Sequence, residues 1–289
     1  MGSEDSECQG ELANCIAEIV EGAGAEGAGV AFHDYANQEE WSLCGDEWFH
    51  AASTIKVPVL VGIFAAIEKG DFTLESRVHV RNQFQSVVDG EPFRVDASRD
   101  ADAEVYSQIG KTMKIGDLAR HMIVTSSNLA TNLLIDAVGL DPIRDKLAEL
   151  GVDGIDLQRG VEDELAYEKG IINRVTANGL VKVLRLIEEK EALAPELCDA
   201  MLEILHAQEF RSGIPAGLPD DARVANKTGE ISTVAHDTGL VYLPDRAPYA
   251  ITILTRWKAD RTAGRRDTLA KISRAVYERL TRAGAGAGE

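Results

Sequence analysis

Residues 223–256 read RVANKTGEISTVAHDTGLVYLPDRAPYAITILTR. Three segments of this stretch alternate in polarity or carry β-branched runs: 223–228, 238–243 and 249–256. Turn-forming residues separate the last two segments, at Pro244-Asp245 and Pro248. Segments of this kind, bounded by turn-forming residues, are typical of strands. The stretch therefore predicts three successive strands near the C-terminus.

Two more strands are expected near the N-terminus, where 30–35 and 41–44 predict a hairpin. Between the two groups of strands the apolar residues recur at helical spacing. The helices expected there are 53–69, 114–124, one that Ser127 or Asn128 caps, one that starts at Asp141, 176–189 and 195–206. Helices are also expected at 11–21 and 267–282, and the Gly/Ala-rich tail 283–289 is expected to be disordered.

This order of elements predicts an α+β fold. A single five-stranded antiparallel sheet would be covered by the terminal helices and would abut an all-helical subdomain. We expect 1–48 and 208–289 to form the α/β subdomain and 49–207 to form the helical one. The crevice between two such parts is the natural place for a site.

Composition narrows the range of partners. The net charge is −18, from 30 basic and 48 acidic residues. An acidic surface repels nucleic acid and anionic lipid, so we expect neither as a partner. No apolar run reaches the roughly 18 residues that a membrane helix needs. We expect a monomer that acts on a small molecule.

The N-terminal residues carry no basic n-region and no apolar stretch. The protein is therefore expected in the cytoplasm as the sequence stands, or in the periplasm or medium if a leader has been removed. Neither the four cysteines nor the six histidines show metal-ligand spacing, and no cofactor or metal is predicted.

The first chemical motif is Ser53-Thr54-Ile55-Lys56, at the start of an expected helix. At i,i+3 the two polar side chains share a face. A serine needs a neighbouring base to become a nucleophile, and a lysine can be that base only when its pKa is lowered. Ser53 is the candidate nucleophile and Lys56 the candidate base. A capping serine beside a surface lysine is the alternative.

Two further motifs follow in chain order. Ser126-Ser127-Asn128 lies at a turn between helices, where Ser126 could relay a proton and Asn128 could orient Lys56 or a substrate amide. Lys227-Thr228-Gly229 lies on an expected strand, where charge and hydrogen bonding suit a carboxylate and the glycine lets a ligand approach. Taken alone, each motif also fits a helix cap or an edge strand.

Together, the three motifs resemble the signature of class A β-lactamases and penicillin-binding proteins. The resemblance covers nearly the whole chain and includes residues 122–134 and 214–219. It implies a β-lactamase/transpeptidase-like fold and an acyl-enzyme on Ser53. It also implies an oxyanion hole made by the backbone N–H groups of Ser53 and Glu230.

The loop that carries the deacylating base in this family departs from the pattern. Glu162-Asp163-Glu164-Leu165 aligns with the family's Glu-Pro-Glu-Leu run, which makes Glu162 the candidate base. A shift of the alignment would nominate Asp163 or Glu164 instead. Ala166 stands where the family has asparagine.

Other positions depart as well. Ser127 replaces the aspartate that is usual in the second motif, and no cysteines sit at the positions of the family's disulfide. The arginine that often binds the substrate carboxylate is missing near His236, so His236 or Arg256 is expected to substitute, or the ligand differs.

Three functions follow from the resemblance and its departures. The first is a serine β-lactam hydrolase that works through an acyl-enzyme on Ser53. The second is a related hydrolase for another amide or ester, such as a peptidoglycan peptide or a small ester. The third is a non-hydrolytic penicillin-binding or sensor protein.

Overall fold

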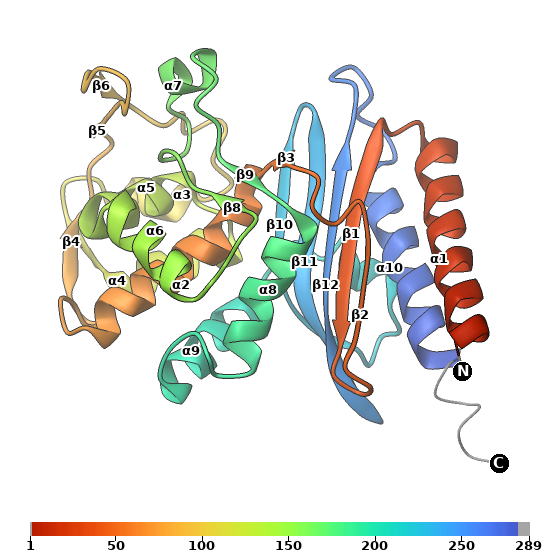
Figure 1. Cartoon of the computed structure of the whole chain (residues 1–289). Helices are drawn as coiled ribbons and strands as arrows, with labels where there is room; N and C mark the ends of the chain where they lie inside the picture. The colour runs from red at the N-terminus through yellow and green to blue at the C-terminus, as the bar shows by residue number, and fades with distance from the viewer. Residues whose placement is uncertain (1, 283–289) are drawn as a thin grey trace.

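One five-stranded antiparallel sheet organises the chain (Figure 1). The computed structural model describes residues 2–282, with residues 2–9 described by their backbone alone, so the predicted disorder of 283–289 lies outside the described residues. The strand order is β10-β11-β12-β1-β2. Its strands are β1 (Gly27–Asp34), β2 (Glu39–Leu43), β10 (Arg223–Ile231), β11 (Val234–Leu243) and β12 (Arg246–Arg256). The predicted α+β fold is confirmed.

The sheet joins the two ends of the chain. Strand β1 lies between β2 and β12, with Gly27 opposite Arg256 and Asp34 opposite Tyr249. Strand β10 pairs only with β11 within the sheet and so forms an edge. An edge strand keeps a row of backbone groups that no neighbouring strand uses. Those groups are available to a ligand or to another element of the protein.

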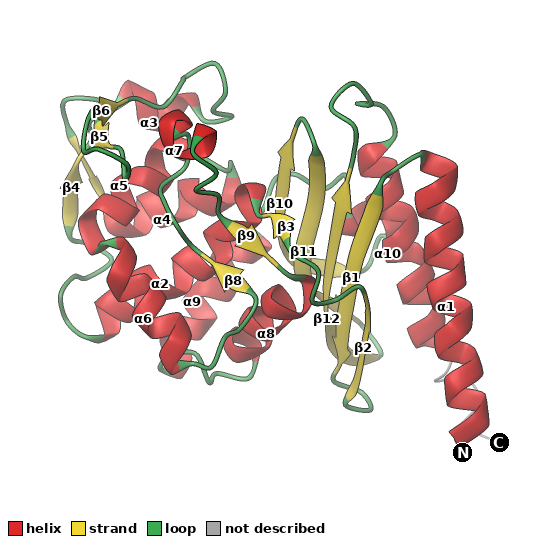
Figure 2. Cartoon of the chain, turned by 45° about the horizontal axis from the view of Figure 1, so that its top comes forward, coloured by secondary structure: helices red, strands yellow, loops and turns green. Residues whose placement is uncertain are grey.

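Side chains of alternate residues point to opposite faces of the sheet, as the strand period of two requires. Ile251 and Ile253 of β12 belong to a core under α1 (Gly2–Ala23) and α10 (Arg265–Arg282). Ala250 and Leu254 of the same strand belong to the core on the other face. Figure 2 shows the two terminal helices side by side on one side of the sheet.

The opposite face packs on a body of helices that surrounds α2 (Lys56–Glu68), where most residues are buried. The other helices of this body are α3 (Ala103–Ser107), α4 (Ile115–Val124), α5 (Asn128–Val138), α6 (Leu140–Glu149), α7 (Glu164–Glu168), α8 (Ala177–Glu188) and α9 (Pro195–His206). Short strands connect them: β3 (Phe49–His50), β4 (Arg77–His79), β5 (Phe84–Gln85), β6 (Pro92–Phe93), β7 (Thr112–Lys114), β8 (Ile155–Asp156) and β9 (Arg174–Val175). Two 3₁₀ turns are η1 (Ala52–Ile55) and η2 (Ile214–Gly217).

Several boundaries differ from the predictions. Strand β11 begins at Val234 rather than at 238, because Ile231 pairs with Val234 across a tight turn and the ladder runs without a break from there. The helix predicted to start at Ser53 starts with the 3₁₀ turn η1 and becomes α-helical at Lys56. The predicted loop 151–174 contains α7.

Among residues 2–282, no helix is both long and apolar enough to cross a bilayer.

Candidate active site

A cavity of about 770 Å³ lies between the helical body and the sheet. Seven of the predicted site residues line it: Ser53, Ser126, Asn128, Glu162, Thr228, Gly229 and Glu230. They come from η1, the α4–α5 turn, the loop before α7 and strand β10. Lys56 and Lys227 lie behind this lining and contact it through Ser126. The three sequence-distant motifs therefore meet at one place.

Lys56 is fully buried at the first turn of α2. Its Nζ donates to Ser126 O at 2.7 Å, to Ser126 Oγ at 3.2 Å and to Asn128 Oδ1 at 2.8 Å. All three hydrogens of an ammonium are thus used by acceptors of the second motif. Lys56 is therefore not the surface lysine of the alternative interpretation.

Lys227 approaches the same hydroxyl from the sheet. Its Nζ donates to Ser126 Oγ at 2.9 Å and to the carbonyl of Thr228 at 2.8 Å, and its side chain is fully buried. Ser126 Oγ therefore bridges two amines that come from different parts of the fold. A hydroxyl can accept from one amine and donate to the other, which is the geometry of a proton relay.

Burial makes these two amines unusually easy to deprotonate. Loss of hydration lowers the pKa of Lys56 to about 7, although the carboxylates of Asp100 and Glu162 oppose that fall. The pKa of Lys227 lies well below its usual range, because the side chain is desolvated and Lys56 repels its charge; Asp237 opposes the shift. One of the pair can therefore be neutral near pH 7 and act as a base.

The turn that carries Ser126 has an unfavourable backbone conformation. Ser126 has φ of +62°, a region that residues with a Cβ rarely adopt. It lies between the end of α4 and the first turn of α5, where the Ser127 side chain accepts from the Ala130 N–H at 3.1 Å. Ser127 is therefore the helix cap, and Asn128 is free to meet Lys56. Backbone strain of this kind is common in catalytic turns.

Gly229 brings strand β10 against η1. A Cβ at this position would lie 3.0 Å from the backbone nitrogens of Ser53 and Thr54. The sequence predicts that Gly229 leaves space for a ligand. In the structure the backbone around Ser53 occupies the space next to Gly229. Ser53 of η1 and Glu230 of β10 both line the cavity beside this close approach. This is the arrangement that a shared oxyanion hole requires.

We expect Gly229→Ala to slow covalent labelling by a fluorescent penicillin about tenfold or more, because a displaced backbone at the reacting group is costly. The added methyl group can be accommodated only if β10 and η1 move apart, since the two nearest atoms that it meets belong to the backbone. Gly27→Ala is the matched control on the same sheet, where a Cβ meets nothing within 4 Å. Equal labelling rates for the two variants would contradict the prediction.

Glu162 faces the cavity from the loop before α7. Its Oε1 accepts from Asn128 Nδ2 at 2.6 Å and its Oε2 accepts from the Asp96 N–H at 2.9 Å. Its backbone φ is +59°, so the loop holds this residue in a strained conformation too. Asn128 thus links the Glu162 carboxylate to the Lys56 amine through one amide side chain.

The two alternative loop residues, Asp163 and Glu164, also line the cavity, but their carboxylates have other partners. Asp163 is buried, caps α7 by accepting from the Ala166 N–H, and accepts from Ser86 Oγ and the Val87 N–H. Glu164 forms an exposed ion pair with Arg99. Ala166 is fully buried and offers no polar side chain where the family has asparagine. Of the three loop carboxylates, Glu162 is the one that contacts Asn128.

His236 does not face the cavity. Its Nδ1 accepts from the Thr255 N–H at 3.1 Å, and its Nε2 lies 2.9 Å from the carbonyl of His50, to which it donates. Burial lowers its pKa to about 4, so the ring is neutral near pH 7. The expectation that His236 binds a substrate carboxylate therefore needs correction. The residue ties β11 to β3 because β11 is longer than the sequence predicted.

Arg256 is not part of the cavity lining either. Its guanidinium donates to Glu47 Oε1 at 2.7 Å and lies over the Phe49 ring. Arg266, at the start of α10, lines the cavity instead and donates to Glu230 Oε2 at 3.0 Å. No motif marks Arg266 in the sequence, so sequence reasoning missed this exposed cation.

Within residues 2–282, no cluster of three or more histidine, cysteine or acidic side chains could hold a metal ion. Cys15, Cys44 and Cys198 are free thiols. Arg99 and Arg159 also line the cavity, beside Arg266 and the hydroxyls, amides and carboxylates already described.

Comparison with known proteins agrees with this arrangement. A family model for the β-lactamase enzyme family matches residues 11–280. β-Lactamase CARB-4 of Pseudomonas aeruginosa is 22% identical over 273 residues, which cover 91% of this chain and 88% of that protein. β-Lactamase L2 of Stenotrophomonas maltophilia is 28% identical over 259 residues, which cover 87% of this chain and 80% of that protein.

Solved structures share the fold. A PBP-A mutant in an acyl-enzyme complex with penicillin G is 25% identical, has a TM-score of 0.80, and the match covers 94% of this chain and 97% of that one. A β-lactamase from Sphaerobacter thermophilus is 26% identical and has a TM-score of 0.77. The match covers 95% of this chain and 97% of that one. The family model spans nearly all of the described residues, so the chain belongs to the β-lactamase enzyme family.

Proposed function

We propose that this protein hydrolyses β-lactams through an acyl-enzyme on Ser53. The observation that carries the proposal is the hydroxyl of Ser126, held between the Nζ atoms of Lys56 and Lys227 at 3.2 Å and 2.9 Å beside Ser53. Acyl transfer from a cyclic amide needs a base for the nucleophile and an acid for the leaving nitrogen. Two coupled amines around one hydroxyl can supply both.

Acylation would use the groups in order. Neutral Lys56 takes the proton of Ser53 Oγ as that oxygen attacks the carbonyl carbon. The backbone N–H groups of Ser53 and Glu230 stabilise the negative oxygen. The C–N bond then breaks while Ser126 gives its proton to the ring nitrogen, and Ser126 regains a proton from Lys56. Lys227 and Thr228 are the proposed anchor for the substrate carboxylate.

Deacylation would use Glu162. Its carboxylate takes a proton from a water molecule that attacks the ester carbonyl, and the Ser53 oxygen leaves with a proton returned from the base. Asn128 and the Asp96 N–H orient this carboxylate from either side. Ala166 contributes no second polar group to hold the water, which favours slow turnover.

The cavity is complete within one chain, which supports action as a monomer on a small-molecule substrate. A net charge of −18 makes nucleic acid an unsuitable partner. Light scattering on the purified protein and gel shift with duplex DNA test these two points. A dimer that stays intact on dilution, or a shifted DNA band at physiological salt, would contradict them.

The acylation rate is expected to depend on pH with a single acid limb centred near pH 7, because Lys56 has a pKa of about 7. The unprotonated amine is the base, and its fraction rises as pH rises through that pKa. Below the limb the rate should fall about tenfold for each pH unit. Stopped-flow nitrocefin acylation between about pH 5 and pH 9 measures it. A flat profile across this range would rule out a titrating base of this kind.

Steady-state assays with nitrocefin and with p-nitrophenyl esters test the proposed reaction against the related-hydrolase alternative. The diverged loop motivates that alternative, because Ala166 offers no polar side chain there. We expect turnover of nitrocefin with little or no ester cleavage. Time-resolved intact mass with benzylpenicillin then tests the sensor alternative. An adduct that forms and decays supports hydrolysis, whereas an adduct that never decays would overturn it.

A further inference from the structure

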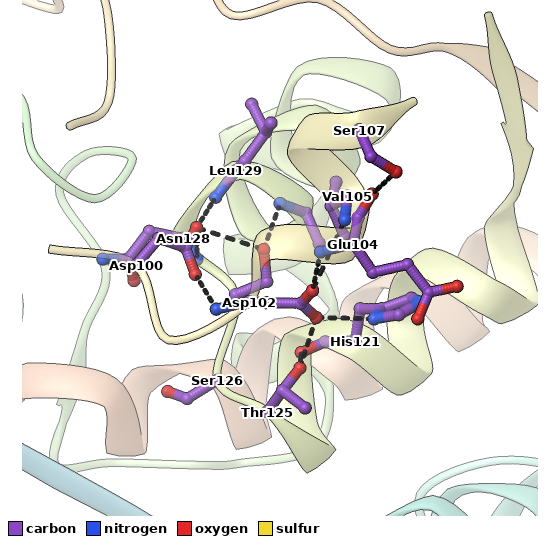
Figure 3. A network of polar contacts seen from close by, with 12 residues as sticks. Asp100, Asp102, Glu104, Val105, Ser107, His121, Thr125, Ser126, Asn128 and Leu129 are labelled. Atoms are coloured by element: carbon purple, nitrogen blue, oxygen red, sulfur yellow. Dashed lines mark hydrogen bonds and ion pairs between the residues drawn. The ribbon is translucent and has the colours of Figure 1, made fainter. Parts of the chain in front are cut away.

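The segment 96–102 braces the turn that carries Ser126, although no motif marks it in the sequence. Asp100 lies at the centre of this contact (Figure 3). Its Oδ2 accepts from the Asn128 N–H at 2.8 Å, from the Leu129 N–H at 2.9 Å and from Ser127 Oγ at 3.2 Å. One carboxylate oxygen therefore binds three groups at the start of α5.

Asp102 holds the other side of the same turn. Its Oδ2 accepts from Thr125 Oγ1 at 2.5 Å and lies 2.5 Å from His121 Nδ1, while its Oδ1 accepts from the Glu104 N–H at 2.8 Å. Thr125 and His121 belong to the end of α4. Ser126 thus lies between Thr125, which Asp102 holds, and the three residues 127–129, which Asp100 holds.

This arrangement explains how the strained turn keeps its shape. Ser126 has a positive φ, and such a conformation persists only where surrounding contacts fix it. The side chain of Ser127 cannot do this alone, because its hydroxyl provides one bond to the Ala130 N–H. The carboxylate of Asp100 satisfies the remaining N–H groups of the first turn, which otherwise have no partner within the helix.

The same contact reaches the reacting amine. Asn128, whose N–H donates to Asp100, accepts from Lys56 Nζ at 2.8 Å through its side chain. The charge of Asp100 also acts on Lys56 directly and favours its protonated form. The other charged groups that act on this amine are the Glu162 carboxylate and the Lys227 amine.

We propose that Asp100 is a positioning residue for acyl transfer, which fixes the turn 126–128 so that the Ser126 hydroxyl and the Asn128 amide meet Lys56. The proposal rests on the proposed function of this site, since its role is defined by acylation of Ser53. Asp100 does not touch the reacting atoms itself. Its carboxylate acts through the backbone and the side chains that it holds.

The first test is Asp100→Asn, with Asp145→Asn on an exposed face of α6 as the matched control. Asparagine keeps the size of the side chain but removes the charge and replaces one acceptor oxygen with a donor. We expect the acylation rate of Asp100→Asn with nitrocefin to fall roughly 10- to 100-fold, the scale of a small misplacement of catalytic groups. The control should keep the wild-type rate.

The pH profile separates positioning from a loss of folding. Removing the Asp100 charge removes a group that favours protonated Lys56, so the acid limb of acylation should move to lower pH while the maximal rate falls. Loosening of the fold alone would lower the amplitude and leave the limb in place. A wild-type rate, or a lower rate with an unmoved limb, would overturn the proposal.

An exchange of side chains tests the location of the carboxylate. Ser127→Asp alone places two carboxylates in contact, because Ser127 Oγ lies 3.2 Å from Asp100 Oδ2, and we expect a slow variant. Asp100→Ser combined with Ser127→Asp puts one carboxylate back at the cap, where aspartate is a favoured residue. The exchanged variant should recover most of the rate lost by Asp100→Ser. Failure to recover would contradict the assignment of the carboxylate to the turn.

These results can be told apart from a failure of the proposed function. If the protein does not acylate β-lactams, the wild type and the Asp145→Asn control will form no adduct. If Asp100 has no positioning role, the wild type and all Asp100 variants will form the adduct at the same rate.

Discussion

Ser53→Ala is expected to abolish the covalent adduct with a fluorescent penicillin. The methyl group cannot form the ester bond, and Ser53 is the cavity-lining serine that lies on η1, three residues before the buried Lys56. Loss of a nucleophile that acts with a base typically removes nearly all of the rate of the covalent step. Gel fluorescence and intact mass after a fixed time measure the effect.

Ser232→Ala is the matched control for this variant. Ser232 lines the same cavity from the turn after β10 and is exposed. It should label at the wild-type rate. Labelling of Ser53→Ala at that rate would remove Ser53 from the role of nucleophile, and loss of labelling only in Ser232→Ala would move the role to the other hydroxyl.

Glu162→Gln is expected to trap the acyl-enzyme. Glutamine keeps an oxygen that can accept from Asn128, but its amide nitrogen cannot accept from the Asp96 N–H or take a proton from water. The half-life of the adduct should lengthen by about 10²–10⁴, the usual cost of losing a general base. Formation of the adduct should continue. Time-resolved intact mass with benzylpenicillin measures both rates.

Glu164→Gln separates the two loop glutamates. The Glu164 side chain is more than half exposed and pairs with Arg99, so its neutral variant should release the acyl group at the wild-type rate. An adduct that persists in Glu164→Gln and decays normally in Glu162→Gln would move the base to Glu164. Decay at the same rate in both variants and the wild type would exclude a glutamate base on this loop.

The chemistry of the site could be read from the sequence because it depends on residue type and order. Lys227-Thr228-Gly229 falls in the first of three β-branched segments, and Ser53 with Lys56 begins a strongly apolar helix. Apolar periodicity fixes which segments become helices and strands, since each must bury one face. The order of those segments was enough to predict the sheet and its helical insert. The ends of the strands did not follow from the sequence in the same way. Strand β11 starts earlier than predicted because its hydrogen bonds to β10 continue as far as Val234.

The contacts of individual polar residues could not be predicted in the same way. His236 was a candidate for the cavity by its position in the chain, yet it ties β11 to β3, and Asp163, which does line the cavity, uses its carboxylate to cap α7. Asp100 and Arg266 were not candidates, yet Asp100 binds the Asn128 N–H and Arg266 lines the cavity. A side chain of one type can cap, pair or catalyse, and the partner that it meets decides between these roles.

Residue identity and spacing thus determined the fold class and the set of candidate site residues, because periodicity and functional-group chemistry are local properties of the chain. The tertiary structure decided that Lys56 is fully buried, that Ser126 stands between two amines, and that Asp100 holds their turn. Burial and like-charge proximity lower the pKa of an amine only when residues far apart in sequence close around it. That closure is a property of the packed molecule, and no single stretch of sequence contains it.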